Sequence, residues 1–278
     1  MNPLPTNTVD EMFRFVYSAV QLAGKESLKY FRTSLNVNNK AAAGKFDPVT
    51  EADKAVERRL RELIEERFPE HAILGEEFDP LVGREGNHFR WLIDPIDGTR
   101  SFISGVPAWG VLLALVYKDQ PLLGVMHQPY LNETFVGLLQ HNEPQAWFFR
   151  EQLVLDQPLA VSRVDSLEQA ILFSTHPEIF EHIPGGFERY QAVARRCKLM
   201  RYGGDCYCYC LLAMGQVDLV IEADLQDYDI LPLVPIVEAA GGVISTWDGA
   251  PVRAGGQVIA AATPELHKQA LSLLNERQ

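Results

Sequence analysis

Residues 91–105 read WLIDPIDGTRSFISG, and they place two carboxylates three positions apart at the end of an apolar strand. Asp94 and Asp97 stand directly before a Gly-Thr pair that can begin a helix. Carboxylate oxygens suit hard cations such as Mg²⁺, and a helix N-terminus offers backbone N–H groups to an anion. The stretch therefore predicts a site for metal ions and phosphate.

The sequence on either side of this stretch indicates two patterns of secondary structure. Upstream, apolar residues recur at helical spacing from Met12 and again from Val56. From Trp91 to about Val161, short apolar runs follow one another closely, which favours an antiparallel meander. After residue 165, such runs alternate with helical stretches, which is typical of an α/β arrangement. The predicted helical stretches are 205–215, 229–241 and 264–276.

The change of pattern predicts two subdomains, with a soft boundary at Gln157 and Pro158. We expect residues 1–157 to form an α+β half with an antiparallel sheet, and residues 158–278 to form an α/β half. Most of the candidate metal ligands fall in the first half. The sequence contains no internal repeat and only a soft boundary, and we expect the two halves to pack as one unit.

Composition excludes several classes of protein. The chain has 278 residues and is 47% hydrophobic, which suits a globular enzyme or binding protein. Its formal net charge of -12 argues against a nucleic-acid partner, because nonspecific binding to phosphates needs basic surface. No apolar run approaches the roughly 18 residues of a membrane span, and residues 1–13 lack the pattern of a signal peptide. We therefore expect a cytoplasmic protein with no membrane partner.

The spacing of the cysteines favours reduced thiols over a disulfide framework. Three of the four fall at positions 206, 208 and 210, which is not the spread pattern of a disulfide-stapled domain. Cys206 and Cys210 can share one helix face, a spacing compatible with two metal ligands. No second Cys or His pair accompanies them, so we favour packing in a helix.

Three further segments place acids where they can join Asp94 and Asp97. Asp53 falls in the first turn of a predicted helix, where an acid can also simply offset the helix dipole. Glu76 follows the tip of a short apolar strand, where solvation is the alternative. Asp229 begins an apolar helix, and alone it would be interpreted as a helix cap.

Together these segments resemble the signature of the magnesium-dependent, lithium-sensitive phosphatases typified by inositol monophosphatase. The resemblance covers nearly the whole chain. Its strongest parts are GEE at 75–77, DPIDGT at 94–99, and Asp229 followed by EAAGG at 238–242. It implies a layered αβαβα sandwich of the inositol monophosphatase and fructose-bisphosphatase type, a homodimer, and hydrolysis of a small-molecule phosphate monoester.

By this resemblance, Glu76, Asp94 and the backbone carbonyl of Ile96 would hold one Mg²⁺. Asp94 would bridge to a second ion, held also by Asp97 and Asp229. Whether a third ion joins beside Glu76 stays open, so the expectation is two or three Mg²⁺ per active site. Two ions about 3.5 to 4 Å apart clamp the attacking and leaving oxygens of an in-line displacement.

The resemblance also assigns the remaining catalytic groups. Water activated at the metal site would attack phosphorus, with its proton drawn toward Thr99 and a carboxylate. The sequence leaves open whether that carboxylate is Glu76 or Asp53. The backbone N–H groups of Gly98 and Thr99 would hold phosphate oxygens.

Three residues carry the expectation about the substrate. Asp205 stands where sugar-type members of the family commonly have Ser or Thr, and Glu222 falls where the family contacts the organic part of its substrate. Arg100 follows the DGT motif in place of the more usual Thr. Two acids facing the leaving group suit a cation better than a neutral polyol. The chain is most similar to the histidinol-phosphate phosphatase branch, so we expect L-histidinol phosphate, an intermediate of histidine biosynthesis.

Other interpretations stay open at this stage. Asp205 can instead cap the helix that it begins, and Glu222 can instead pair with Arg201 or Lys198. An inositol-1-monophosphatase or a broad sugar-phosphate phosphatase is the alternative enzyme. A noncatalytic scaffold that binds phosphate and metal is the alternative from another class of protein.

Overall fold

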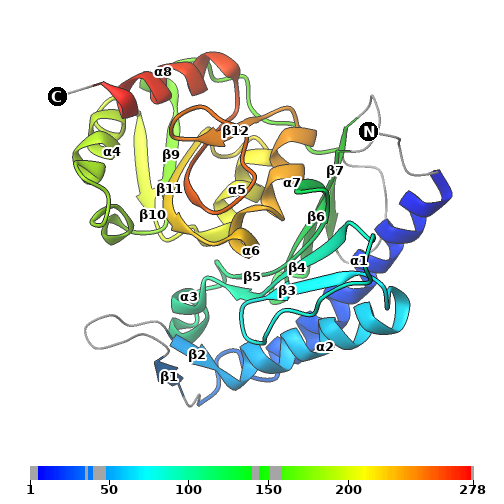
Figure 1. Cartoon of the computed structure of the whole chain (residues 1–278). Coiled ribbons are helices and arrows are strands. Elements are labelled where there is room, and N and C mark those ends of the chain that lie inside the picture. Colours follow the sequence, from blue (N-terminus) through cyan, green and yellow to red (C-terminus); the bar gives the residue numbers. More distant parts are fainter. Residues whose placement is uncertain (1–5, 35–36, 40–47, 140–143, 151–157, 277–278) are drawn as a thin grey trace.

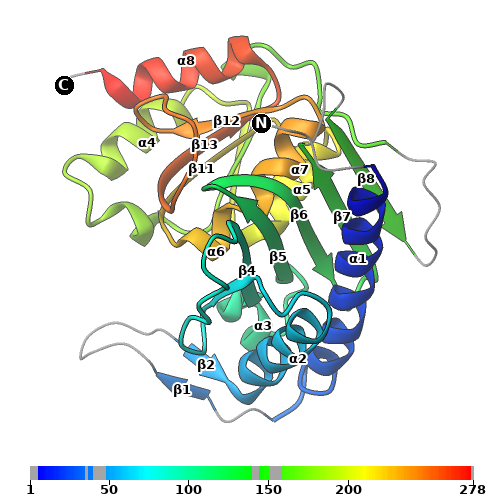
Figure 2. The same cartoon turned by 45° about the vertical axis from the view of Figure 1, so that its right-hand side comes forward.

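The computed structural model describes residues 6–34, 37–39, 48–139, 144–150 and 158–276. Two β-sheets alternate with three layers of helices, so the chain forms an αβαβα sandwich (Figures 1 and 2). This arrangement confirms the expected α/β fold class and the layered architecture.

The larger sheet has six strands in the described residues, in the order β3-β4-β5-β6-β7-β8. The strands are β3 (Ala72–Gly75), β4 (Phe89–Asp97), β5 (Gly110–Tyr117), β6 (Gln120–Gln128), β7 (Glu133–Leu138) and β8 (Gln145–Arg150). From β4 to β8 every pairing is antiparallel, which confirms the predicted meander. Strand β3 joins β4 in parallel, with Gly75 opposite Ile93. Both strands therefore end at the same edge of the sheet.

The second sheet has five strands in the described residues, in the order β10-β9-β11-β13-β12. The strands are β9 (Ile171–Ser174), β10 (Leu199–Tyr202), β11 (Leu219–Leu225), β12 (Val243–Thr246) and β13 (Gly256–Ala261). Strands β10, β9 and β11 are parallel, whereas β13 pairs antiparallel with both of its neighbours. The predicted alternation of strands and helices is confirmed, and the sheet that it forms is mixed. A short antiparallel pair, β1 (Val37–Asn39) with β2 (Pro48–Thr50), lies apart from both sheets.

The outer helices cover the exposed faces of the two sheets. Helices α1 (Thr6–Leu28) and α2 (Glu51–Arg67) pack on the larger sheet. In α2, Val56, Leu60 and Ile64 are fully buried against this sheet, as their helical spacing predicts. Helices α4 (Gly186–Ala194) and α8 (Pro264–Asn275) pack together beside the second sheet, and α8 contacts β13. Two short 3₁₀ helices, η1 (Leu167–Gln169) and η2 (Pro177–Phe180), complete the second half.

The middle layer consists of α5 (Asp205–Ala213), α6 (Asp227–Ile230) and α7 (Leu233–Ala239), and it joins the two sheets. One hydrophobic cluster includes Leu112 of the larger sheet, Cys208 of α5 and Val220 of the second sheet. Helix α7 lies directly on β6 and β7 because glycines face it. A Cβ added at Gly124 would come 1.9 Å from the carbonyl oxygen of Pro232. This hydrophobic cluster contains residues from both halves of the chain. The division into two subdomains at residue 157 therefore remains a prediction.

The prediction of one continuous helix over 229–241 is wrong. Helix α6 ends at Ile230 and α7 begins at Leu233. Pro232 stands between them, and proline lacks the N–H that would continue the hydrogen-bond ladder of α6. Within the described part of the chain, none of the helices has the length and apolar character needed to cross a membrane.

Candidate active site

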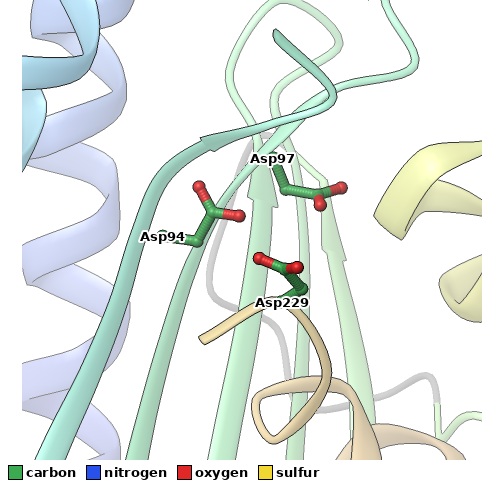
Figure 3. A group of neighbouring side chains, drawn as sticks. All are labelled: Asp94, Asp97 and Asp229. Carbon is green, nitrogen blue, oxygen red and sulfur yellow. The ribbon is translucent and has the colours of Figure 1, made fainter. Parts of the chain in front are cut away.

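A β-bulge in β4 brings Asp94 and Asp97 together. Side chains alternate between the two faces of a regular strand, so residues three apart would point to opposite faces. Asp94 pairs with Leu112 and Asp97 with Gly110, which sets three steps on β4 against two on β5. The extra residue bends the strand and re-aims the side chains, as bulges commonly do beside active sites. Both carboxylates consequently point toward the middle layer (Figure 3).

Asp229 completes a carboxylate cluster with Asp94 and Asp97 from the opposite side (Figure 3). Candidate ligand atoms of these three side chains lie within 4.8 Å of one another. Asp229 is the third residue of α6, and its Oδ2 accepts a hydrogen bond of 2.7 Å from the backbone N–H of Gln226. Asp229 is thus the N3 partner of a capping box whose N-cap is Gln226, and it also belongs to the carboxylate cluster.

Glu76 and Asp53 approach the cluster from β3 and α2. Because β3 is parallel to β4 with Gly75 opposite Ile93, Glu76 leaves its strand next to Asp94. Glu76 lines the same cavity as Asp97 and Asp229. Asp53 is only 1% exposed and is close enough to Asp94 for its charge to raise the pKa of that carboxyl. The structure thus brings both candidate bases to the site.

Burial and mutual repulsion disfavour negative charge on this cluster. Burial, followed by the charges of Glu76 and Asp97, raises the pKa of Asp94 well above its usual range. Burial, followed by the charge of Asp205, raises the pKa of Asp97 to about 7, although the hydrogen bond from Cys206 acts in the opposite direction. Burial and the charge of Asp97 likewise raise the pKa of Asp229.

The donor set fits divalent metal ions with oxygen ligands. Within the described residues, no Lys or Arg forms an ion pair with Asp94, Asp97 or Asp229. Buried carboxylates without a cationic partner are costly unless a bound cation balances them. All the ligand atoms are oxygens, which is the set that Mg²⁺ prefers. The site can therefore hold Mg²⁺ at Asp94, Asp97 and Asp229.

Ile96, Gly98 and Thr99 form the turn that leads from β4 into α3 (Thr99–Ser104). Ile96 lies in the bulge, where its N–H donates to Oδ1 of Asp94 and its carbonyl accepts from the Thr99 hydroxyl at 3.2 Å. Gly98 precedes the helix with φ of 82°. The predicted helix start at Gly98 and Thr99 is confirmed.

Replacing Gly98 by alanine should damage the site, whereas Gly86→Ala should cost only backbone strain. Both glycines have φ of +82°, where an L-residue costs about 1 to 2 kcal/mol. A Cβ at Gly98 would also lie 3.0 Å from Cβ of Asp205, whereas a Cβ at Gly86 meets nothing within 4 Å. We expect both variants to lose unfolding free energy in urea, with the larger loss in Gly98→Ala. We expect only Gly98→Ala to lose the phosphate release that the resemblance implies. Equal activity in the two variants would contradict a role for Gly98 in shaping the site.

A cavity of about 1000 Å³ extends from the carboxylate cluster between the two halves of the chain. Its wall includes Arg100, Asp205 and Glu222, the three residues predicted to contact substrate. Arg100 lies at the exposed rim, where its Nη1 is 3.4 Å from Glu178 of η2. Of the predicted site residues, Glu76, Asp97, Arg100, Asp205, Glu222 and Asp229 line this cavity, and Ile96, Gly98 and Thr99 form the turn beside it. Asp94 and Asp53 are buried next to the cluster and do not line the cavity.

Asp205 and Glu222 do not make the contacts of the alternative interpretations. Asp205 accepts a hydrogen bond of 2.6 Å from the hydroxyl of Ser101 rather than from the backbone of α5. Glu222 is 2% exposed and accepts a hydrogen bond of 2.6 Å from the backbone N–H of Thr175. In the described part of the chain, neither Arg201 nor Lys198 forms an ion pair with Glu222.

Sequence reasoning missed the groups that hold these side chains in place. The backbone N–H of Cys206 donates to Oδ2 of Asp97 at 2.6 Å, so the N-terminus of α5 binds this carboxylate. Ser101 and Thr175 orient Asp205 and Glu222 in the same way. The Ser101 and Cys206 bonds join residues more than 100 positions apart, and residue spacing contains no signal for such pairs.

The cysteines pack as predicted. All four are free, and Cys206, Cys208 and Cys210 are buried. Burial raises the pKa of these three thiols well above the usual range, so they remain protonated. Among the described residues, they take part in no group able to hold a metal ion.

Comparison with known proteins agrees with this geometry. A family model described as the inositol monophosphatase family matches residues 8–278. The bifunctional phosphatase IMPL2 of Arabidopsis thaliana is 37% identical over 286 residues, covering 98% of this chain and 79% of the relative. A histidinol-phosphatase of Chlorobaculum parvum is 34% identical over 253 residues, covering 91% and 92% of the two chains.

A solved structure shows the same fold. An inositol monophosphatase from Zymomonas mobilis is 34% identical and superposes with a TM-score of 0.82, covering 96% of this chain and 98% of the other. The family match spans the carboxylate cluster, the turn at Gly98 and the cavity wall. The chain belongs to the inositol monophosphatase family, as the resemblance of its motifs predicted.

Proposed function

We propose that this protein is a Mg²⁺-dependent phosphomonoesterase that hydrolyses L-histidinol phosphate to L-histidinol and phosphate. One observation carries the proposal: the cavity that contains Asp97 and Asp229 also contains two further acids, the half-buried Asp205 and the buried Glu222. A phosphate bound at the metal cluster would place the organic part of its ester against these acids. The similarity to histidinol-phosphatases supports this substrate. A cytoplasmic location and a homodimer remain predictions.

In the proposed mechanism, Asp94, Asp97 and Asp229 would hold two or three Mg²⁺ together with Glu76 and the carbonyl of Ile96. When bound, the ions supply positive charge that stabilises the phosphoryl oxygens and lowers the pKa of water.

The protein's own groups would orient the ester and move the proton. The Thr99 hydroxyl donates to the Ile96 carbonyl and can still accept a hydrogen bond from the attacking water, since a hydroxyl both donates and accepts. The proton that this water loses would go to a carboxylate, either Glu76 on the cavity wall or the buried Asp53. The first N–H groups of α3, at Gly98 and Thr99, have no acceptor within their helix and would hold phosphate oxygens.

The cationic amine and imidazole of histidinol explain why acids line the far wall. Glu222 keeps one carboxylate oxygen on the Thr175 N–H, which leaves the other to accept from a substrate donor. Asp205 is likewise held by Ser101. A neutral polyol would leave the half-buried Asp205 and the buried Glu222 without a cation, which is unfavourable.

Asp205→Asn should raise KM for histidinol phosphate by about 10-fold, because a charge-assisted hydrogen bond becomes a neutral one. KM for a neutral monoester should change little. The control is Asp224→Asn, an exposed acid on the same cavity wall, which alters the general potential without removing a buried contact. Steady-state kinetics on both substrates decides the matter, and equal effects on the two substrates would refute a contact between Asp205 and the cation.

An inositol-1-monophosphatase is the second candidate, and the 34% identity with the Zymomonas mobilis inositol monophosphatase favours it. The ratio of kcat/KM for histidinol phosphate to that for inositol 1-phosphate separates the two candidates. A preference for inositol phosphate would overturn the substrate while leaving the metal site intact. Phosphate release from neither ester, nor from nucleotide phosphates, in the presence of Mg²⁺ would favour a noncatalytic scaffold.

A further inference from the structure

Tyr207, on the first turn of α5, forms a hydrogen bond far from its own part of the chain. Its hydroxyl donates to Oε2 of Glu133, the first residue of β7. The ring also packs edge-on against Phe135, with centroids 6.1 Å apart. Arg150 lies on the other side of the acid, with its Nε 3.9 Å from the second carboxylate oxygen, Oε1. Neither Tyr207 nor Glu133 lies on the wall of the active-site cavity.

Two acceptors on different strands hold the first turn of α5. Cys206 donates its N–H to Asp97 at the end of β4, and the next residue, Tyr207, donates to Glu133 on β7. The two acceptors lie at the same end of the strands. Asp97 pairs with Gly110, the first residue of β5, and Glu133 pairs with Gln128, the last residue of β6. Three strand spacings of about 4.8 Å separate β4 from β7. The first turn of α5 therefore lies across the ends of these strands, bonded to β4 through Cys206 and to β7 through Tyr207.

In the bond between Tyr207 and Glu133, burial keeps the Tyr207 hydroxyl as the donor and the Glu133 carboxylate as the acceptor. Glu133 is 9% exposed. Burial, followed by the hydrogen bond to Glu133, raises the pKa of Tyr207, so the phenol keeps its proton and acts as the donor.

The residue that precedes the attachment is strained. Asp205 has φ of 43°, a left-handed conformation that costs a non-glycine residue free energy and persists only where surrounding contacts enforce it. Its carboxylate accepts from Ser101, the backbone N–H of the next residue, Cys206, donates to Asp97, and the side chain of Tyr207 donates to Glu133. The Tyr207–Glu133 bond is thus one of the contacts that keep Asp205 turned toward the cavity.

We propose that Tyr207 and Glu133 form a positioning pair for the reaction. By holding the first turn of α5, they align the Cys206 N–H with Asp97 and so fix a metal-binding carboxylate from outside the cavity. Groups that orient metal ligands in this way commonly contribute 10- to 100-fold to metal affinity or activity. The inference rests on the proposed function in that Asp97 is taken as a Mg²⁺ ligand.

The test removes only the hydroxyl, with Tyr207→Phe. We expect the Kd for Mg²⁺, measured by titration calorimetry, to rise by about 10-fold. At saturating Mg²⁺, KM for a neutral monoester should stay within about twofold of the wild-type value, since ground-state contacts to the substrate are intact. Tyr117→Phe is the matched control, because it removes a tyrosine hydroxyl at the other end of β5 from Gly110.

Changes at Glu133 separate positioning from packing. Glu133→Gln keeps an oxygen that can accept from Tyr207 and should retain most of the Mg²⁺ affinity, whereas Glu133→Ala should lose about as much as Tyr207→Phe. The double variant Tyr207→Phe/Glu133→Ala should be no worse than either single change, because one bond is lost in all three.

Wild-type Mg²⁺ affinity in Tyr207→Phe, or an equal loss in Tyr117→Phe, would overturn the inference. The inference would also be overturned if Tyr207→Phe binds Mg²⁺ more weakly only near its thermal unfolding transition and binds it as tightly as the wild type well below that temperature. Such a loss would reflect stability alone. Failure of the wild-type protein to release phosphate would refute the proposed function, while the calorimetric comparison would still test the positioning pair.

Discussion

Asp94→Asn should lower kcat/KM for phosphate release by about 10³-fold or more, and at the same time it should make the metal-free protein more stable. The loss is expected because Asp94 belongs to the carboxylate cluster and an amide cannot offer two anionic oxygens. The gain follows because Asp94 is 2% exposed and faces the charges of Glu76 and Asp97. Relief of that repulsion should add about 1 to 2 kcal/mol to the free energy of unfolding.

The two effects have separate measurements and one control. Phosphate release reports the first, and urea unfolding in the presence of a chelator reports the second. The amide oxygen of Asn can still accept from the Ile96 N–H, so the bulge should survive. Asp119→Asn is the control, since Asp119 lies in an exposed turn at φ of 60°, which Asn tolerates. An active Asp94→Asn enzyme would refute the metal assignment.

The metal-free protein should lose stability as the pH rises from about 5 to about 8, and Mg²⁺ should restore it. The pKa of Asp97 is raised to about 7, against about 3.9 in an unfolded chain. Between these values the folded state holds a proton that the unfolded state has released. The stability contributed by this proton is complete below the unfolded pKa and is lost as the pH rises through the folded pKa. For this half-buried group the slope is at most about -1.4 kcal/mol per pH unit.

Bound Mg²⁺ prefers the ionised carboxylates, so the stabilisation that it provides should grow with pH. Thermal unfolding with chelator and with saturating Mg²⁺, at a series of pH values, measures both trends. Asp97→Asn should flatten the slope of the metal-free protein. A metal-free protein whose stability rises across this pH range would contradict the assigned environment of the cluster.

The elements of the fold with strong local patterns could be predicted from the sequence. The meander of β4 to β8 and the face of α2 follow from periodicity alone, because burial of one face imposes that period. The helix over 229–241 could not be predicted correctly, since its apolar residues continue past the proline that divides it. Residue types likewise identified the acids of the site, because few arrangements explain two carboxylates directly before a Gly-Thr turn.

The geometry that makes these acids a site is a tertiary property. A regular strand would separate Asp94 from Asp97, and only the register with β5 shows the bulge that unites them. The orientation of Asp97 depends on the N–H of Cys206, and that of Asp205 on the Ser101 hydroxyl. These bonds form between segments that meet only when the two sheets pack on the middle layer.

Residue type and periodicity in the sequence determined the α/β class and the identity of the acids, and the motifs carried the resemblance that implied the family and the layered sandwich. Only the tertiary structure decided which oxygens converge, which backbone groups hold them, and that Asp205 and Glu222 line the cavity beside the carboxylate cluster. The physical reason is that carboxylate chemistry belongs to single residues, whereas burial, repulsion and hydrogen-bond direction depend on neighbours that are distant in sequence.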